Sequence, residues 1–458
     1  MTDLTAYTAQ QLRDRMATRD LKAVDVMTAF LDRIDAANPK VNAIVSLRDR
    51  AELLAEAEAL DAGPIRGPLH GLPMAPKDLS DTAGLRTTYG CPLFENHVPE
   101  ADSALAARLR KTGAIFIGKT NTAEFGLGSH TYNPVHGTTL NPYDTDRSAG
   151  GSSGGAGVAL ATRMLPIADG SDMMGSLRNP AGWANVYGFR PSYGMVPKEP
   201  AGDAFHAQLS TTGPMARNPG DLRLLLDVLS EPDMRSPHRA PTQRKLPRQI
   251  KWVGDWNGRL PMEDGILETC KTALDALVAC GMTVSGGVPE TDPDAIWQAW
   301  TDLRSWVLGG ELEKHYTDPD MRKRLKPEVI WEVERGLSMN TSTVHSASVI
   351  RSDLFREIET ANTLWASPSA QIFPFQKDLD WPSSIADQEM DTYHRWMETV
   401  IVPSLIGAPA ICIPAGFHNG LPIGLQIYGP RGTDHALIEL AEAYHEATDW
   451  PARMPSPI

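Results

Sequence analysis

Two adjacent serines, Ser152 and Ser153, lie in the glycine-rich stretch RSAGGSSGGAG, which covers residues 147–157. A third serine, Ser176, follows Ser152 by 24 residues in the stretch DGSDMMGSLRNPAG. Glycine is costly to order, because it loses more backbone freedom on folding than any other residue. The concentration of glycine around these hydroxyl groups therefore needs an explanation, and serine chemistry is one that the residue types allow.

A serine hydroxyl is a poor nucleophile until a base takes its proton. The stretch GSSGG matches the G-x-S-x-G elbow of hydrolases, with Ser153 as nucleophile, and that motif requires a preceding strand and a later acid and histidine. The preceding residues NPYDTDRSA are typical of turns, and the late histidines His418 and His435 do not lie in loops that mark them as partners. A Ser–His–Asp site is therefore the weaker alternative.

A lysine held neutral by burial is the usual substitute base. A lysine ordinarily titrates near a pKa of about 10.4, and burial lowers this pKa by up to about 3–5 units. Lys77 directly follows the apolar, proline-containing run GLPMAP. Most lysines lie on the surface, but this neighbourhood favours a buried position for Lys77.

Two other kinds of site are disfavoured by their sequence context. The stretch GAIFIGKT, residues 113–120, matches a P-loop pattern, but a helix is expected before it and a strand inside it, where the phosphate would have to bind. The twelve histidines form no H-x-x-x-H pair with a nearby acid, so a metal site is not indicated.

The composition is that of a globular protein, with 41% hydrophobic and 22% charged residues. A net charge of −14 argues against binding to nucleic acids and to anionic membranes. The four cysteines are widely spaced, which indicates reduced thiols rather than a zinc site or disulfides. No secretory signal and no apolar run of 18 residues is found, so we expect a cytoplasmic protein.

The alternation of strand, helix and loop patterns predicts an α/β protein. No convincing linker divides the chain, and we expect a single domain over residues 1–458. Residues 1–62 read as a layer of helices, and residues 69–200 alternate between short apolar strands, helices and glycine-rich turns. Residues 294–400 read as long helices rich in tryptophan. The stretches GAPAICIPAG and LPIGLQIYGP then predict two buried strands.

Four stretches taken together resemble the amidase signature family in their order and spacing: HGLPMAPKDLSDTAG, GKTNTAEFG, NPYDTDRSAGGSSGG and GSDMMGSLRNPAG. The resemblance covers nearly the whole chain and continues in GFRPSYGMVP, TTGPMARNPGDLRLLLDVL and GAPAICIPAGFHNGLPIGLQIYGP. It implies a mixed sheet of roughly eleven strands surrounded by helices. It also implies an amidohydrolase that needs no cofactor and no metal. We expect the chain to act on a small molecule as a monomer or homodimer and, from its charge, to bind neither nucleic acid nor membrane.

The resemblance also assigns roles to individual residues. It implies that Ser176 is the nucleophile, that Ser152 carries a cis peptide bond and relays the proton, and that Lys77 is the base. The flanking glycines then let the backbone pack closely around this relay. The remaining implied residues are the backbone amides of an oxyanion hole at Met173, Met174, Gly175 and Ser176, the supporting residues Ser153, Asp172 and Arg178, and the substrate-binding residues Gly126 and Leu127.

The substrate is indicated less directly. Met174 stands where the family resemblance leads us to expect a glycine, and Met173 adds a second adaptable apolar side chain beside Ser176. Residues 294–400 contain seven of the eleven tryptophans. Apolar pockets favour aromatic walls, so we expect an apolar, aryl-bearing amide or carbamate (a urethane) rather than a small charged amide. Two alternatives are an amidotransferase subunit of the same family, which works in a complex on charged tRNA, and a catalytically silent binding protein on the same scaffold.

Overall fold

The N-terminal part of the protein is a layer of three helices, α1 (Ala9–Ala17), α2 (Ala23–Val41) and α3 (Arg50–Ala62), as the periodicity predicts. Thr8 and Gln11 form a reciprocal capping box at the start of α1. Asn42 ends α2 in the left-handed conformation, with φ of 52°. The computed structural model describes residues 3–199 and 202–458, so residues 1–2 of the predicted N-terminal layer and residues 200–201 lie outside it.

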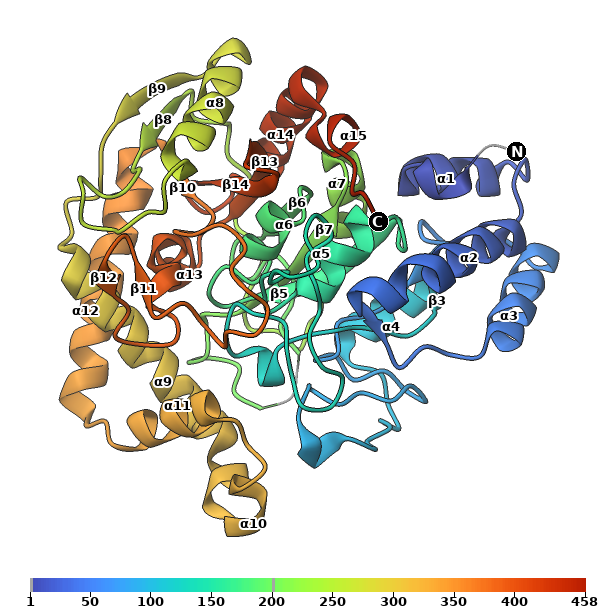
Figure 1. Ribbon diagram of the computed structural model, residues 1–458, viewed down its shortest axis with the longest axis horizontal. Helices are drawn as coiled ribbons and strands as arrows, with labels where there is room; N and C mark the ends of the chain where they lie inside the picture. Colours follow the sequence, from blue (N-terminus) through green and yellow to red (C-terminus); the bar gives the residue numbers. More distant parts are fainter. Residues whose placement is uncertain (1–2, 200–201) are drawn as a thin grey trace.

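A mixed sheet of eight strands forms the centre of the described chain (Figure 1). In spatial order the strands are β5 (Ile167–Asp172), β7 (Thr211–Ala216), β6 (Tyr187–Arg190), β13 (Ala410–His418), β14 (Leu421–Tyr428), β10 (Leu364–Pro368), β8 (Gln249–Trp252) and β9 (Thr283–Gly286). The pairs β10–β8 and β8–β9 are parallel, and the others are antiparallel. The predicted α/β fold with a mixed sheet is therefore confirmed, with eight strands in this sheet instead of about eleven.

Six short strands form three separate pairs beside the main sheet. These pairs are β1 (Ile44–Val45) with β4 (Lys119–Thr120), β2 (Pro73–Met74) with β3 (Ile115–Phe116), and β11 (Ser384–Ile385) with β12 (Gln388–Glu389). Lys77 follows β2 and forms a parallel bridge with Thr120. The first two pairs therefore fix the backbone that carries Lys77.

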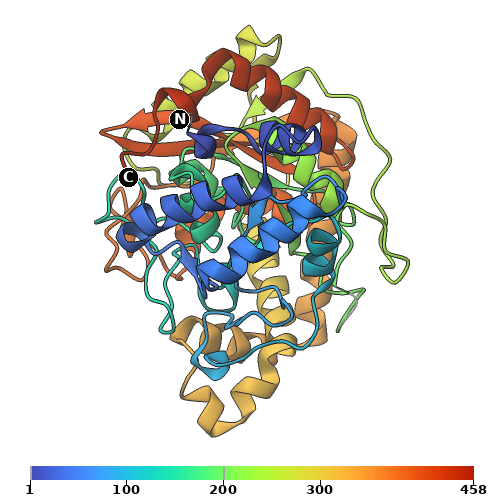
Figure 2. The ribbon, with the colours of Figure 1, turned by 90° about the vertical axis from the view of Figure 1, so that its right-hand side faces the viewer.

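Helices surround the sheet, and Figure 2 shows α2 and α3 crossing in front of it when the molecule is turned. Apart from α1–α3 and a separate group described below, the α-helices around the sheet are α4 (Ala104–Lys111), α5 (Gly154–Ala161), α6 (Asn179–Trp183), α7 (Pro219–Leu229), α8 (Ile266–Ala279), α13 (Ile401–Ile406), α14 (Asp434–Thr448) and α15 (Trp450–Arg453). Short 3-10 helices are η1 (Leu4–Ala6), η2 (Pro92–Phe94), η3 (Glu124–Gly126) and η4 (Arg395–Val400).

A group of helices on the side of the molecule away from α1–α3 corresponds to the tryptophan-rich region (Figure 1). It comprises α9 (Pro293–Thr317), α10 (Pro319–Arg322), α11 (Pro327–Leu337) and α12 (Thr341–Ala361). The prediction of long helices over 294–400 is wrong beyond residue 361, because β10 then enters the main sheet between β14 and β8. Its run LWASP is short and fully buried, and such a run has no periodicity by which to distinguish strand from helix.

Candidate active site

Lys77 is buried, with 1% of its surface exposed, and its side chain ends among three serine hydroxyls. Its Nζ lies 2.8 Å from Ser152 Oγ, 2.9 Å from Ser153 Oγ and 3.2 Å from Ser171 Oγ. Burial lowers the pKa of Lys77 to about 7, although the carboxylates of Asp169 and Asp172 act in the opposite direction. The lysine can therefore exist as a neutral amine near neutral pH.

Ser152 is held by backbone that packs unusually closely. The peptide bond between Gly151 and Ser152 is cis, which is the bond that the resemblance implied. Ser153 follows as the N-cap of α5. A side chain at Gly155 would place its Cβ 2.4 Å from the backbone nitrogen of Asn121, far inside the contact distance. The dense glycines thus allow α5 to begin directly against the segment that follows β4.

Ser176 lies just beyond the end of β5, in a loop that we define as residues 172–178 and call the 172–178 loop. The loop turns sharply at Gly175, which has φ of +77°. A Cβ at this position would also lie 2.8 Å from Cγ2 of Val400, so glycine is required for two reasons. The Ser176 side chain is buried but reaches a cavity that Ser152 also lines.

Asp172 and Arg178 hold this loop from inside the protein. Arg178 donates from Nε and Nη2 to the two carboxylate oxygens of Asp172, at 3.0 and 2.9 Å. Arg178 Nη1 also donates to the backbone oxygen of Val400 at 2.8 Å. Although burial by itself raises the pKa of the Asp172 carboxyl, Arg178 and Arg190 outweigh it and hold this pKa well below its usual range. Both side chains are fully buried, so they position the loop and do not line the cavity.

One of the four amides expected to form an oxyanion hole is already used. The N–H of Gly175 donates to Asp172 Oδ1 at 2.9 Å, so it is engaged inside the loop. The amides of Met173, Met174 and Ser176 make no hydrogen bond within residues 3–199 and 202–458. The expectation for Gly175 is therefore corrected, because the carboxylate that holds the loop takes up that donor.

The cavity at Ser152 and Ser176 has a volume of about 420 Å³. Gly126 and Leu127, the two residues expected to bind substrate, both line it. Its apolar lining comes from distant parts of the chain, namely the residue after Asp78, the segment around η3, the 172–178 loop and helix α9: Leu79, Phe125, Leu127, Met173, Val307 and Leu308. Polar side chains also line the cavity, and these are Lys198, Glu199, Ser210, Thr211, Thr212 and Glu311 of α9.

The tryptophans of residues 294–400 do not form this wall. None of the seven, all of which lie in described parts of the chain, lines the cavity. They serve mainly as packing residues: Trp297 stacks on Trp300 with ring centroids 5.9 Å apart, and Trp396 stacks on Trp183 at 5.7 Å. Met174 is likewise buried in the core, whereas Met173 reaches the cavity.

Two residues at the site were missed from the sequence. Ser171 lines the cavity and approaches Lys77 Nζ, and Asp169 is fully buried with its Oδ2 accepting the backbone N–H of Lys77 at 3.3 Å. Burial raises the pKa of the Asp169 carboxyl. Both belong to strand β5 and lie two residues apart in the stretch DGSD. Side chains two residues apart point to the same face of a strand, so the strand that leads to Ser176 carries the signal that could have identified them.

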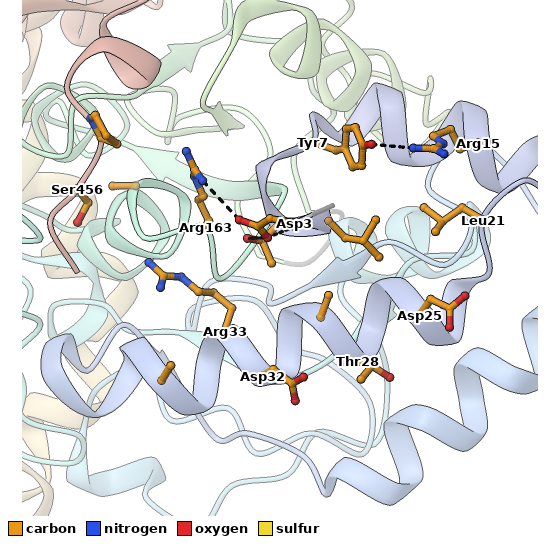
Figure 3. Close-up of a pocket in the computed structure, with 16 residues that line it drawn as sticks. Asp3, Tyr7, Arg15, Leu21, Asp25, Thr28, Asp32, Arg33, Arg163 and Ser456 are labelled. Carbon is orange, nitrogen blue, oxygen red and sulfur yellow. Dashed lines mark hydrogen bonds and ion pairs between the residues drawn. The ribbon is translucent and has the colours of Figure 1, made fainter. Parts of the chain in front are cut away.

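The other motifs take structural roles. In the P-loop-like stretch, β3 (Ile115–Phe116) occupies the place where a phosphate would have to bind, as expected. Lys119 lies in β4 and donates from Nζ to the backbone oxygen of Ser80 and to Thr82 Oγ1. Another cavity, of about 1130 Å³, lies between η1, α2 and the C-terminal segment (Figure 3). It contains none of the predicted site residues, and charged groups at its edge pair with each other, as Arg163 does with Asp3.

Features of metal and membrane proteins are not found in residues 3–199 and 202–458. No group of three or more histidine, cysteine, aspartate or glutamate side chains there is arranged to hold a metal ion. No helix in the same ranges has the length and apolar character needed to cross a membrane. The four cysteines, all of which are described, are free thiols, as their spacing predicted.

A family model described as Amidase matches residues 25–438, which is most of the chain. The chain belongs to the amidase family. It is accordingly an amidohydrolase, an enzyme that cleaves carbon–nitrogen bonds. The family match includes every residue of the site described above.

Known proteins similar to this amidase include several tRNA amidotransferase subunits. A glutamyl-tRNA(Gln) amidotransferase subunit of Thermus thermophilus is 34% identical, over 96% of this chain and 97% of that protein. Among solved structures, a bacterial aryl acylamidase of the amidase signature family gives a TM-score of 0.90 at 24% identity, with 99% of each chain covered. The corresponding glutamyl-tRNA(Gln) amidotransferase subunit of Thermotoga maritima gives 0.75 at 24% identity, over 97% of this chain and 96% of that one. These two structures show the shared fold.

Proposed function

We propose that this amidase hydrolyses an apolar, aryl-bearing amide or carbamate through a covalent seryl intermediate. The observation that carries the proposal is the contact of 2.8 Å between Lys77 Nζ and Ser152 Oγ, next to a cavity that Ser152 and Ser176 both line. A neutral amine, a relaying hydroxyl and a second hydroxyl in a half-apolar cavity are the groups that acyl transfer to serine requires.

The proposed reaction begins with proton transfer. Neutral Lys77 draws the proton of Ser152, which takes the proton of Ser176 as Ser176 Oγ bonds to the substrate carbonyl carbon. The negative charge that develops on the carbonyl oxygen is stabilised by the free amides of Met173, Met174 and Ser176. Ser152 then returns a proton to the leaving nitrogen, the C–N bond breaks, and water hydrolyses the acyl–Ser176 ester.

The apolar wall of the cavity supports an aryl-bearing substrate. Phe125, Leu127 and Met173 line the cavity together with Val307 and Leu308 of α9. An aromatic ring beside flexible thioether and aliphatic groups suits a planar apolar group better than a short charged chain. The tryptophans expected to form this wall pack elsewhere.

The second candidate function is that of an amidotransferase subunit. The support for it is that relatives with 30–34% identity, from Thermus thermophilus, Dehalococcoides mccartyi and Burkholderia vietnamiensis, are glutamyl-tRNA(Gln) amidotransferase subunits. In that case Ser176 would release ammonia from an amide donor, and partner chains would complete the reaction. A catalytically silent protein is the third possibility, and the contacts of Lys77 with Ser152 and Ser153 argue against it.

The test is a substrate panel with the purified single chain. The panel contains an aryl amide, an aryl carbamate, an aryl ester, acetamide, malonamate and glutamine, and kcat/KM is measured for each. The proposal expects an aryl amide or carbamate to exceed the small amides by about tenfold or more, which corresponds to ~1.4 kcal/mol of transition-state preference. A preference for glutamine that emerges only with added partner subunits would favour the amidotransferase. Absence of both turnover and labelling by a serine-reactive phosphonate would favour the silent protein.

A further inference from the structure

A hydrogen bond from an arginine side chain connects the 172–178 loop to the helices α9–α12. Arg304 of α9 donates from Nη1 to Sδ of Met173 at 3.1 Å. Met173 lines the cavity three residues before Ser176. The contact therefore connects helix α9 to the proposed oxyanion-binding backbone.

Arg304 is held in place by contacts on each of its nitrogens. Nε donates to Glu332 Oε1 of α11 at 2.6 Å, and Nη2 donates to the hydroxyl of Tyr393 at 2.8 Å. Glu332 also accepts the hydroxyl protons of Tyr393 at 2.5 Å and of Ser305 at 2.6 Å. Arg304 is 3% exposed and Glu332 is fully buried, so neither charge can turn to solvent instead.

The guanidinium also stacks on an aromatic ring, with the carbon of its head group 5.2 Å from the ring centroid of Trp300. Within the described parts of the chain, Met173 Sδ is the hydrogen-bond acceptor for Nη1. A buried N–H group without an acceptor costs free energy, because it has lost its hydrogen bonds to water and gained none in return. The rigid guanidinium therefore has a fixed direction, and its contact with the Met173 sulfur holds that residue against α9.

We propose that Arg304 is a positioning residue that acts through the Met173 thioether to hold the backbone of the 172–178 loop ready for reaction. This inference rests on the proposed function, because it assumes that Ser176 reacts and that the amides of Met173 and Met174 face the developing charge. Asp172 and Arg178 hold the interior of the loop, and the Arg304–Met173 contact holds its cavity side. Both sides must be fixed for the amides to keep one direction.

The experiment measures how fast an aryl fluorophosphonate labels Ser176 in the full chain, with the maximal rate kinact separated from the binding constant KI. The variant Met173→Leu keeps the apolar volume but removes the sulfur acceptor. The variant Met173→Gln supplies an oxygen acceptor at a similar reach. We expect Met173→Leu to lower kinact by about tenfold, ~1.4 kcal/mol, with little change in KI. We expect Met173→Gln to recover most of the loss.

A matched control and a second variant separate positioning from general destabilisation. Ser305→Ala removes a hydrogen bond to Glu332 in the same network without touching Met173, and it should leave kinact close to that of the unaltered protein. Arg304→Lys keeps a positive charge beside Glu332 but replaces the planar, three-nitrogen fork of arginine, so the Nη1 donor that faces Met173 is lost. Because Arg304 and Met173 act as a pair, the double variant Met173→Leu, Arg304→Lys should react no more slowly than the slower single variant.

Three results would overturn the inference. These are equal kinact values for Met173→Leu and the unaltered protein, a change confined to KI, and additive losses in the double variant. The failure of the proposed function looks different, because a chain without the proposed chemistry would not be labelled at Ser176 at all, and a chain without the aryl preference would be identified by the substrate panel.

Discussion

Lys77 Nζ lies within 2.9 Å of both Ser152 Oγ and Ser153 Oγ, although Lys77 and the two serines are 75 and 76 residues apart in the chain. The lysine is brought there by the short β2–β3 pair, and the serines are brought there by the tight start of α5. Because the amine is buried and contacts hydroxyl groups instead of water, its charged form is poorly solvated. This relationship is the physical basis of the lowered pKa and of the proposed proton relay.

Lys77→Met should remove the base while filling nearly the same volume. We expect kcat/KM to fall by about 10²–10⁴-fold, the usual contribution of a general base. The matched control is Lys119→Met, another buried lysine, whose Nζ contacts Ser80 and Thr82 rather than a serine that lines the cavity. The control should keep its activity per folded molecule, and near-normal activity in Lys77→Met would rule out the relay.

The pH dependence of kcat/KM should report the titration of Lys77. The pKa of Lys77 is lowered to about 7 by burial, and only the neutral amine can accept a proton. Activity should therefore be low in acid, rise through neutral pH and level off in mildly alkaline solution. A profile that is flat or falling across this range, measured with an uncharged substrate, would contradict the assignment.

Ser176→Ala should abolish turnover, since no acyl–enzyme bond can form. Mass spectrometry of the unaltered protein quenched during turnover of an aryl ester should show the added mass of the acyl group on the peptide that contains Ser176. Ser153→Ala is the control, because Ser153 contacts Lys77 but does not line the cavity. In this variant the acyl group should still be found on the peptide that contains Ser176. An acyl group found on Ser153 or Ser152 would reassign the nucleophile.

Asp172→Asn should destabilise the fold as well as the site. The change leaves the buried guanidinium groups of Arg178 and Arg190 without a carboxylate, and breaking such a buried pair costs about 3–5 kcal/mol. Urea unfolding should therefore show a large loss of stability. The control is Glu442→Gln, which removes the carboxylate of a half-exposed pair with Arg223 and should cost only about 0–1 kcal/mol.

Phe125→Ala should test the apolar wall. We expect kcat/KM for an aryl amide to fall by about tenfold, because an aromatic contact and buried area are lost, while the value for acetamide changes little. Trp331→Ala serves as a comparison, since Trp331 is aromatic and lies in the same half of the molecule but does not line the cavity. Equal losses for the aryl amide and acetamide in Phe125→Ala would mean that the ring supports the fold and does not select the substrate.

Much of the fold could be predicted from local patterns. Helices α2 and α8 have clear amphipathic periodicity, and strands β13 and β14 are mostly apolar and mostly buried runs. Strand β10 was missed because a buried run of five residues has no periodicity of its own. The neighbours β14 and β8 on its two sides, which only the folded chain provides, decide that it is a strand.

The sequence by itself determined the chemical groups: a lysine in an apolar run, serines among glycines, and a family pattern that orders them. Tertiary structure alone decided which of these groups meet and what surrounds them. It brought Ser171 to Lys77, used the Gly175 amide for Asp172, and placed Phe125 and α9 around the cavity in place of the tryptophans. The physical reason is that burial and hydrogen-bond partners depend on contacts between distant segments, whereas residue type and periodicity are properties of the local chain.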